Sequence, residues 1–273
     1  MPLSQSALMS PDPTLDHPGT VAAGGDLRTR EVPAVRRAMA ILWLLGRHSA
    51  GLSLSRIARE LDVLPSTCLH ILRELVATRL LAVDSDTKLY RLGSGVLTLA
   101  RMLSQQNQFV RFAQPVLDHL SREFHVGASA QQRERDDDMV VVAAASVVPG
   151  DMVSPGARTP LFTSASGRLM AALNDFTEDE LRRRFARVRW QQPPDVETWL
   201  KEMRAARRNG YAVDEGHFRK GITAIAAPVF NADGIAERAI SITTVSAQLD
   251  AATRKRLAKQ VQAAAAEVSK ALR

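Results

Sequence analysis

Polar side chains at helical spacing between residues 66 and 73 are the ones in this chain best suited to hydrogen-bond with the edges of nucleic-acid bases. The set consists of Ser66, Thr67, His70 and Arg73. They share one face of a predicted helix, whose other face is apolar and carries Cys68, Ile71, Leu72, Leu75 and Val76. Such groups on a helix are typical of base recognition in the major groove of duplex DNA.

Two further elements would hold this helix against DNA. A shorter amphipathic helix over residues 54–61 precedes it, and Pro65 favours a break between the two helices. Residues 80–83 and 89–92 flank a turn at residues 84–87, which predicts a β-hairpin. This order is that of a winged helix-turn-helix. The other candidate DNA contacts are Ser53 and Ser55 before and in the first helix, and Lys88, Tyr90 and Arg91 in the wing.

The charge distribution favours DNA binding over an ordinary pair of surface helices. Residues 28–92 contain eleven Lys or Arg and six Asp or Glu, a net charge of +5, whereas residues 113–250 contain seventeen and nineteen, a net charge of −2. A local positive excess is the electrostatic footprint of a phosphate-binding surface. A second excess of +5, six basic residues against one acidic residue, lies in residues 251–273.

Composition indicates a water-soluble chain with a substantial core. Its 273 residues are 45% hydrophobic, a length that suits two domains, and no apolar run approaches the roughly 20 residues that span a bilayer. We therefore expect no membrane partner. Residues 1–27 are rich in Pro, Gly, Ser and Asp and carry no signal-peptide pattern, which predicts a disordered tail and a cytoplasmic protein. The single cysteine, Cys68, excludes an intramolecular disulfide.

Two apolar helices flank the predicted winged helix-turn-helix. In residues 32–48, the side chains expected to cover the helix pair are Val35, Met39, Leu42 and Leu45. After the break at residues 93–95, residues 96–106 form a helix with an apolar stripe that continues at helical spacing through residues 109–124. We assign residues 1–27 to the tail, 28–92 to a DNA-binding domain, 93–112 to a linker helix and 113–273 to a second domain.

The second domain shows a mixed pattern of strands and helices. Strands are expected at residues 126–132, 139–148, 221–230 and 235–245, and helices at residues 164–173, 178–188, 195–209 and 250–272. Residues 149–160 are expected to form a loop, and the acidic residues 136–138 a solvated turn rather than a cation site. The fold class is therefore α+β, with helices packed on a mixed sheet.

Four segments, in this order, resemble the IclR family of bacterial transcriptional regulators. They are Ala34–Leu42, Leu52–Leu61, Tyr90–Gly93 and Ile225–Phe230, read in the sequence as AVRRAMAIL, LSLSRIAREL, YRLG and IAAPVF. The resemblance, which spans residues 32 to about 272, implies an N-terminal winged helix-turn-helix, a linker helix and a C-terminal GAF-like effector-binding domain that senses a small organic metabolite. It also implies homodimers or homotetramers.

The chain departs from the family pattern at three positions. His70 stands where the recognition helix usually has arginine, Arg79 stands where that helix usually ends with glycine, and Ala224 stands where a cysteine usually precedes the Ile-Ala-Ala-Pro segment. Imidazole lacks the two-pronged donor geometry that suits guanine, so the base preference should differ. Loss of the cysteine suggests a different ligand.

We expect the effector to be a small organic acid. The helix from residue 164 opens with the small residues Ser164, Ala165, Ser166 and Gly167, whose free backbone N–H groups would favour a carboxylate. Ser241 and Thr243 should share one face of a strand while Ile240 and Ile242 pack on the other. The family resemblance assigns ligand contact to Asp214, which favours a ligand with a hydroxyl or other donor. A hydroxy- or keto-acid fits, an aromatic one included, because an apolar volume could form beside Ala224, Met152, Val153 and Phe162.

Two other functions compete with this interpretation. An enzyme is disfavoured because residues 164–167 lack the Gly-x-Ser-x-Gly pattern that exposes a nucleophilic serine, and the six histidines show no metal-binding spacing. We therefore expect no cofactor and no metal. A metabolite-binding module without DNA contacts is the other alternative. The favoured function is a metabolite-responsive transcriptional regulator that controls a catabolic operon. Two chains are expected to pair through their linker helices, and the pair is expected to bind a pseudo-palindromic duplex operator.

Overall fold

The computed structural model describes residues 32–134, 138–148, 153–174 and 176–273, and the described residues divide into two compact units, with the boundary between residues 106 and 107. The boundary between the units falls inside the range 93–112 that the sequence assigns to a linker, whose own limits stay a prediction. The tail predicted at residues 1–27 lies outside the described residues.

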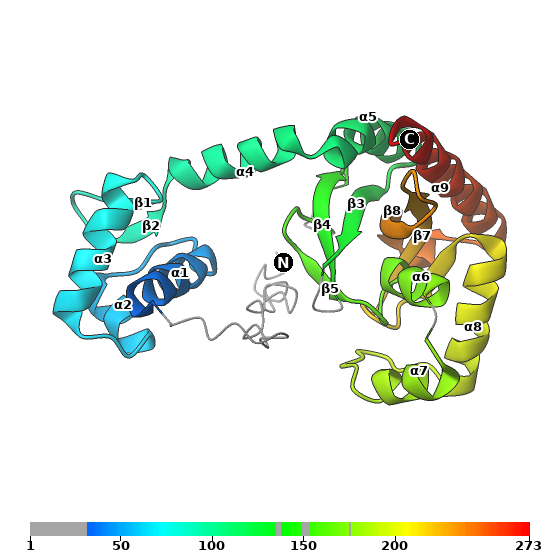
Figure 1. Cartoon of the computed structure of the whole chain (residues 1–273), viewed down its shortest axis with the longest axis horizontal. Coiled ribbons are helices and arrows are strands. Elements are labelled where there is room, and N and C mark those ends of the chain that lie inside the picture. The colour runs from blue at the N-terminus through cyan, green and yellow to red at the C-terminus, as the bar shows by residue number, and fades with distance from the viewer. Residues whose placement is uncertain (1–31, 135–137, 149–152, 175) are drawn as a thin grey trace, which may run out of the picture. The chain divides into compact units, whose positions relative to one another are not determined.

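The first unit is a winged helix-turn-helix, as the sequence predicts (Figure 1). Its buried core joins Ile41 and Leu45 to Leu52, Ile57, Ala58, Cys68, Leu72, Leu75 and Leu81. The strands of the wing pair in antiparallel register. The elements are α1 (Pro33–Gly46), α2 (Leu54–Glu60), α3 (Pro65–Ala77), β1 (Leu81–Val83), β2 (Tyr90–Leu92) and α4 (Ser94–Gln106).

The face of α1 that packs on the helix pair differs from the prediction. Ile41 and Leu45 are buried, whereas Val35 and Met39 are 59% and 45% exposed. The expectation that Val35 and Met39 cover the pair is therefore wrong. The apolar residues of α1 occupy more than one face, and periodicity alone does not say which face meets the core.

Arg79 adopts the left-handed conformation that glycine usually provides at the end of the recognition helix. It follows the helix with φ 61°, in the left-handed region, and its N–H donates to the carbonyl of Val76. The carbonyl of Arg79 in turn accepts from the N–H of Gly95 at 2.9 Å. A Cβ on Gly93 would lie 2.3 Å from that carbonyl oxygen, so residues 93–95 are a close backbone contact as well as a break between elements.

The apolar stripe that continues past residue 106 belongs to two separate helices. Helix α4 ends at Gln106, and α5 (Gln108–Phe124) begins with Asn107 as its N-cap, whose side chain accepts from the N–H of Phe109 at 3.0 Å. Asparagine is a strong N-cap because its side chain satisfies a backbone donor that the helix leaves open. The second unit therefore has its own helix start signal.

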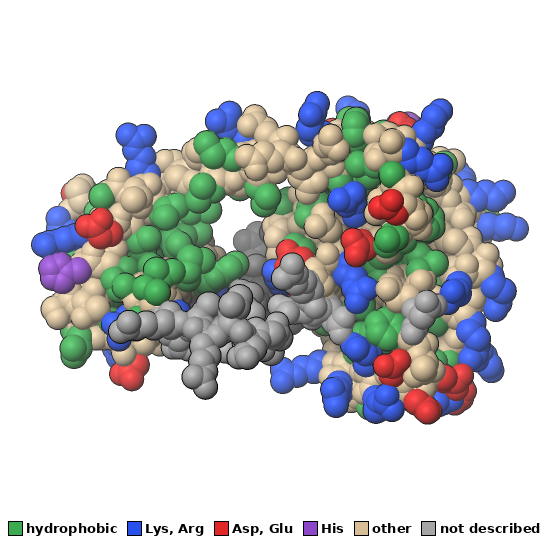
Figure 2. Space-filling view, in the orientation of Figure 1, with side chains coloured by type: hydrophobic (Ala, Val, Ile, Leu, Met, Phe, Trp, Pro, Cys, Tyr) green, Lys and Arg blue, Asp and Glu red, His purple; other side chains and the backbone are tan. Residues whose placement is uncertain are grey.

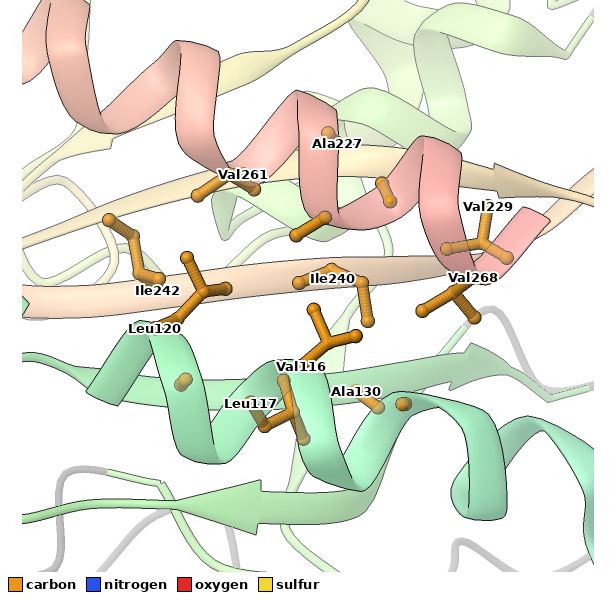
Figure 3. Packing of buried hydrophobic residues seen from close by; sticks show 14 of the residues in the cluster. Val116, Leu117, Leu120, Ala130, Ala227, Val229, Ile240, Ile242, Val261 and Val268 are labelled. Atoms are coloured by element: carbon orange, nitrogen blue, oxygen red, sulfur yellow. The ribbon is translucent and has the colours of Figure 1, made fainter. Parts of the chain in front are cut away.

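The second unit is an antiparallel six-stranded sheet with helices on both faces. The strand order is β5-β4-β3-β8-β7-β6. Helices α5 and α9 cover one face, where they enclose the core drawn in Figure 3, and α6 and α8 pack on the other. The elements are β3 (Gly127–Arg133), β4 (Asp138–Ala145), β5 (Arg158–Pro160), α6 (Ala165–Leu173), α7 (Glu178–Phe185), α8 (Val196–Asn209), β6 (Ala212–Glu215), β7 (Ile222–Phe230), β8 (Ala236–Val245), a 3-10 turn (Ser246–Gln248) and α9 (Ala251–Ala271).

The two edge strands, β5 and β6, were not predicted from the sequence, and β5 corrects the expectation that residues 149–160 form a loop throughout, because residues 158–160 are a strand. They have only three and four residues. Each pairs with one neighbour, β4 and β7 respectively. A strand of this length cannot display a convincing period of two, so its pairing is decided by the neighbouring strand rather than by its own pattern.

Candidate functional site

The exposed face of α3 carries the four side chains that the sequence marks for base recognition. Cys68, Leu72 and Leu75 are buried. Ser66, His70 and Arg73 are exposed on the opposite side, with Thr67 half-buried beside them. Among the described residues, none of these four side chains has a hydrogen-bond or ion-pair partner. Their donors and acceptors are therefore free for an external ligand.

Ser53 and Ser55 lie at the start of α2 and differ in role. The Ser53 hydroxyl is the N-cap and accepts from the backbone N–H of Arg56 at 3.4 Å. Ser55 is exposed, and its hydroxyl lies 3.2 Å from that of Ser53. Ser53 is thus engaged within the helix, whereas Ser55 keeps hydrogen-bonding capacity toward the solvent.

The wing is organised by Asp84. Its Oδ1 accepts from the N–H of Asp86 and from both the N–H and the hydroxyl of Thr87, and these hydrogen bonds, those of Thr87 first, lower the pKa of the Asp84 carboxyl from its ordinary value. Lys88 follows with φ 56° and an exposed side chain. The local geometry therefore presents a cation at the end of the turn.

The remaining wing candidates are more tied to the protein. Tyr90 packs against the core of the first unit. The Nε of Arg91 donates to the carbonyl of Ala50 at 3.2 Å, although much of the side chain is exposed. Of the three wing residues, Lys88 is thus the one whose side chain neither packs on the core nor forms a hydrogen bond or ion pair with the described residues.

In the second unit, strand register brings the candidate effector residues onto one face of the sheet. Asp214 pairs with Ala224, and Ala224 pairs with Thr243 on the next strand. Ser241 stands one row away, opposite Ala226. Ile240 and Ile242 point into the α5 and α9 core, as predicted from the alternation of β8 (Figure 3). The polar residues of β8 therefore face the side covered by α6 and α8.

Two neighbours of Ser241 were not among the residues predicted from the sequence. Ser129 is fully buried and pairs with Ser241 across the sheet. The Gln131 amide donates to the Ser129 hydroxyl at 3.1 Å and accepts from the hydroxyl of Ser166. Both lie on β3, whose small and polar residues gave no clear alternation.

The start of α6 is partly occupied by its own side chains. The Ser164 hydroxyl accepts from the N–H of Gly167. The expectation that this N–H is free for a ligand is therefore wrong. A Cβ on Gly167 would lie 2.3 Å from the carbonyl oxygen of Leu161, so this glycine permits a close backbone approach. Within the described part of the chain, the N–H groups of Ala165 and Ser166 have no acceptor. These two donors are the remaining anion-binding capacity of the helix start.

Arg168 is the charged residue at the centre of this site, and it too was not predicted from the sequence. It is 1% exposed, and its guanidinium donates to Glu202 at 2.6 Å, to Asp214 at 3.1 Å and to the carbonyl of Thr163 at 3.0 Å. Nδ1 of His217 lies 3.1 Å from the same guanidinium. Burial lowers the pKa of Arg168, and the two carboxylates oppose this effect. A sequence signal exists, because Arg168 is the sole charged residue in a helix whose other residues are either small or apolar.

Arg168 changes the electrostatics expected at Asp214. Asp214 is 2% exposed, and its second carboxylate oxygen accepts from the N–H of Phe218 at 3.3 Å. Burial raises the pKa of Asp214, while the charge of Arg168 and the backbone hydrogen bonds act to lower it. With an arginine in contact, Asp214 presents no bare charge that would repel an acid.

The apolar candidates flank this polar cluster. Phe162 is buried and meets Phe176 edge to face at 5.5 Å between ring centroids. Ala224 is buried, Val153 is half-buried, and Met152 lies outside the described residues. The Thr243 hydroxyl is buried with no hydrogen-bond partner in the described structure. An unsatisfied hydroxyl beside small side chains is a place where a polar ligand atom would be stabilised.

These features define a class of protein. It has a winged helix-turn-helix whose recognition helix presents side chains without partners in the described structure, followed by a sheet domain with a buried polar site. Models of two family domains match this chain, the "IclR helix-turn-helix domain" over residues 34–85 and the "Bacterial transcriptional regulator IclR C-terminal" over residues 101–270. The chain belongs to the IclR family of bacterial transcriptional regulators. It is a DNA-binding regulator with an effector-binding domain, and not an enzyme.

Curated relatives and solved structures agree with this assignment. The chain is 27% identical over 245 residues to the "HTH-type transcriptional regulator BhcR" of Paracoccus denitrificans, covering 87% of this chain and 86% of that one. It is 29% identical over 225 residues to the "HTH-type transcriptional repressor AllR" of Escherichia coli, covering 79% and 81%. An IclR transcriptional regulator from Alicyclobacillus acidocaldarius superposes with a TM-score of 0.76 at 28% identity, covering 89% of this chain and all of that one.

A second solved structure shares the fold at lower identity. It is an IclR homolog from Microbacterium hydrocarbonoxydans complexed with 4-hydroxybenzoate, with a TM-score of 0.73 and 20% identity, covering 88% of this chain and 98% of that one.

In the described part of this chain, no helix is long and apolar enough to cross a membrane.

Proposed function

We propose that this regulator binds a pseudo-palindromic duplex operator as a dimer or tetramer and that a small organic acid alters this binding, so that a catabolic operon responds to its substrate. The observation that carries the DNA part is the exposed face of α3. Ser66, Thr67, His70 and Arg73 would read base edges in the major groove, while Lys88 would contact phosphate or the minor groove.

Binding measurements on two variants would test this assignment. His70→Ala should weaken operator binding by roughly 1–3 kcal/mol and relax the preference at one base pair, because a base-edge hydrogen bond is lost. Lys88→Ala should weaken binding to all sequences alike and flatten the salt dependence. His125→Ala, which removes an exposed histidine of the second unit, is the matched control. Unchanged affinity and base preference in His70→Ala would show that the proposed orientation of α3 in the major groove is wrong.

Pairing of two chains is supported by the surface of α4. No residue of α4 is buried within its own unit, and its exposed apolar residues include Leu97, Leu99, Met102 and Leu103. Leu103 is 68% exposed, which is costly unless another surface covers it. Sedimentation should give a dimer or tetramer, and the double variant Leu99→Glu, Leu103→Glu should shift it toward monomer. A wild-type monomer at micromolar concentration would exclude this part.

The effector part rests on the face of the sheet beneath α6. The free N–H groups of Ala165 and Ser166 suit a carboxylate, and the buried hydroxyls of Ser241 and Thr243 suit a hydroxyl or keto oxygen. Phe162 and Ala224 supply apolar surface for an aromatic ring. Asp214 contributes here mainly by holding Arg168 in place, since the two side chains hydrogen-bond to each other.

Calorimetry with a panel of hydroxy- and keto-acids tests the effector site. The compound 4-hydroxybenzoate belongs in the panel because the IclR homolog from Microbacterium hydrocarbonoxydans is complexed with it. Ser241→Ala and Thr243→Val should weaken binding of a confirmed effector about 5- to 10-fold each, since one neutral hydrogen bond contributes roughly 1 kcal/mol. Thr244→Val, on the opposite face of β8, is the control. Equal binding by all folded variants would place the effector elsewhere.

A further inference from the structure

The second basic excess of the chain forms an exposed surface on the second unit. The first turn of α9 contains no acidic residue, and Lys255 and Lys259 follow one turn apart on its solvent side, both exposed. Neither lysine lies in the last turn of α9, where a cation stabilises the helix dipole, so this dipole interaction does not explain their position.

Helix α8 brings a third cation to the same surface. The side-chain amide of Gln262 on α9 donates to the carbonyl of Asn209 at the end of α8, at 2.8 Å. Arg208 precedes Asn209 and is exposed, and Lys259 stands one helical turn before Gln262. We call the set of Arg208, Lys255 and Lys259 the α8–α9 basic face.

Two nearby arginines form ion pairs with carboxylates, but the members of this face do not. Arg254 forms an ion pair with Glu215, and Arg204 with Glu178. By contrast, Arg208, Lys255 and Lys259 have no carboxylate partner among the residues that the structure describes. Figure 2 shows Lys and Arg side chains gathered along the edge of the second unit that α8 and α9 form. The result is a patch of uncompensated positive charge on a unit in which residues 113–250, Arg208 included, carry a net charge of −2.

We propose that the α8–α9 basic face binds the phosphate backbone of duplex DNA, as a second, sequence-independent contact in addition to α3 and the wing. This inference rests on the proposed DNA-binding function. Clustered cations without carboxylate partners release counterions when they meet phosphates, so they increase affinity on any sequence. Lys255 and Lys259 lie about 6 Å apart along the helix axis, which allows both to approach one backbone strand.

Salt-dependent binding of the full-length protein to duplexes of random sequence and graded length tests the proposal. The double variant Lys255→Ala, Lys259→Ala should bind long duplexes at least 10-fold more weakly at low salt. The slope of log affinity against log salt concentration should become shallower by about 2, since each phosphate contact contributes roughly 0.9. Adding Arg208→Ala should reduce it further, and Lys255→Arg, Lys259→Arg should restore binding.

The control removes the same charge at and just beyond the other end of the same helix. Lys270→Ala, Arg273→Ala should leave the slope within about 0.5 of wild type, because Lys270 lies roughly 16 Å from Lys259 along the helix axis and Arg273 follows the last helical residue. A slope that is equal in the test and control variants at every DNA length would overturn the proposal, and this face would then fit an acidic protein surface. If wild type binds DNA but only Lys88→Ala weakens it, the proposed function stands without the second contact. Absence of wild-type binding to any duplex would overturn both.

Discussion

The recognition face of α3 and the polar cluster beneath α6 contain similar side chains in opposite states. On α3, His70 and Arg73 are exposed and have no partner in the described structure. Beneath α6, Ser166 and Arg168 are buried and bonded to other residues of the same unit. A buried polar group must be satisfied internally, whereas an exposed one can exchange water for a ligand. The first surface is therefore uncommitted until DNA binds, and the second is assembled when the chain folds.

The largest expected effect is at Arg168. Arg168→Met should destabilise the second unit by about 3–5 kcal/mol, because it leaves Asp214 buried without its charge partner. Urea unfolding followed by tryptophan fluorescence measures this in a Trp43→Phe background, where the emission comes from Trp190 and Trp199 in the second unit.

The matching change on α3 sharpens the comparison. Arg73→Met should alter stability by less than about 0.5 kcal/mol, because Arg73 is exposed and has no partner among the described residues. If the two substitutions cost the same, the contrast between an uncommitted and a preassembled site is not real.

An effect between those of Arg168→Met and Arg73→Met is expected at Gly93, in the first unit. Gly93→Ala should cost about 1–3 kcal/mol, because the new Cβ would lie 2.3 Å from the carbonyl oxygen of Arg79 and backbone must move. Gly46→Ala is the control, since its Cβ would make only an ordinary 3.7 Å contact with the Leu92 side chain. Thermal unfolding of both variants decides the matter, and equal melting temperatures would contradict the close contact.

Arg79→Gly should act in the opposite direction. Glycine adopts the left-handed conformation at this position without the steric cost that arginine bears, so a gain of roughly 0.5–1 kcal/mol is expected for the first unit. Equilibrium unfolding of the full chain, followed by Trp43 fluorescence, measures the difference. A loss of stability would mean that the Arg79 side chain contributes more than its backbone strain costs.

The last prediction concerns Asp84 and pH. Hydrogen bonds from Thr87 lower the folded-state pKa of Asp84, so their stabilisation of the wing is present above the unfolded-state pKa and is lost as the pH falls through the folded-state pKa. Carboxyl NMR should show Asp84 titrating below the ordinary value for aspartate, and Asp84→Asn should lack this step. A titration at or above the ordinary value would contradict the hydrogen-bonded wing.

Sequence reasoning located the first site better than the second for a physical reason. Residues 66–73 belong to an amphipathic helix, where a period of 3.6 residues separates the solvent face from the core. His70 and Arg73 follow directly from that pattern. Val35 and Met39 were assigned to the core wrongly, because α1 has apolar side chains on more than one face.

The second site depends on contacts between segments far apart in the chain. Alternation along β8 predicted which face Ser241 would occupy, but the pairing of Ser129 with Ser241 is a matter of strand order and register. Arg168 meets Asp214 across 46 residues. No local period reports such a contact, although a lone charge in an apolar helix does indicate that a partner exists.

The N-cap at Asn107 allows the second unit to begin independently of the first. Because α5 begins with a capping residue of its own, its first turn does not rely on hydrogen bonds from α4. Fraying of one helix therefore need not spread into the other. A chain cut between residues 106 and 107 would keep a natural start at its new end, so the sensing unit of this protein is suited to transplantation behind a different DNA-reading head.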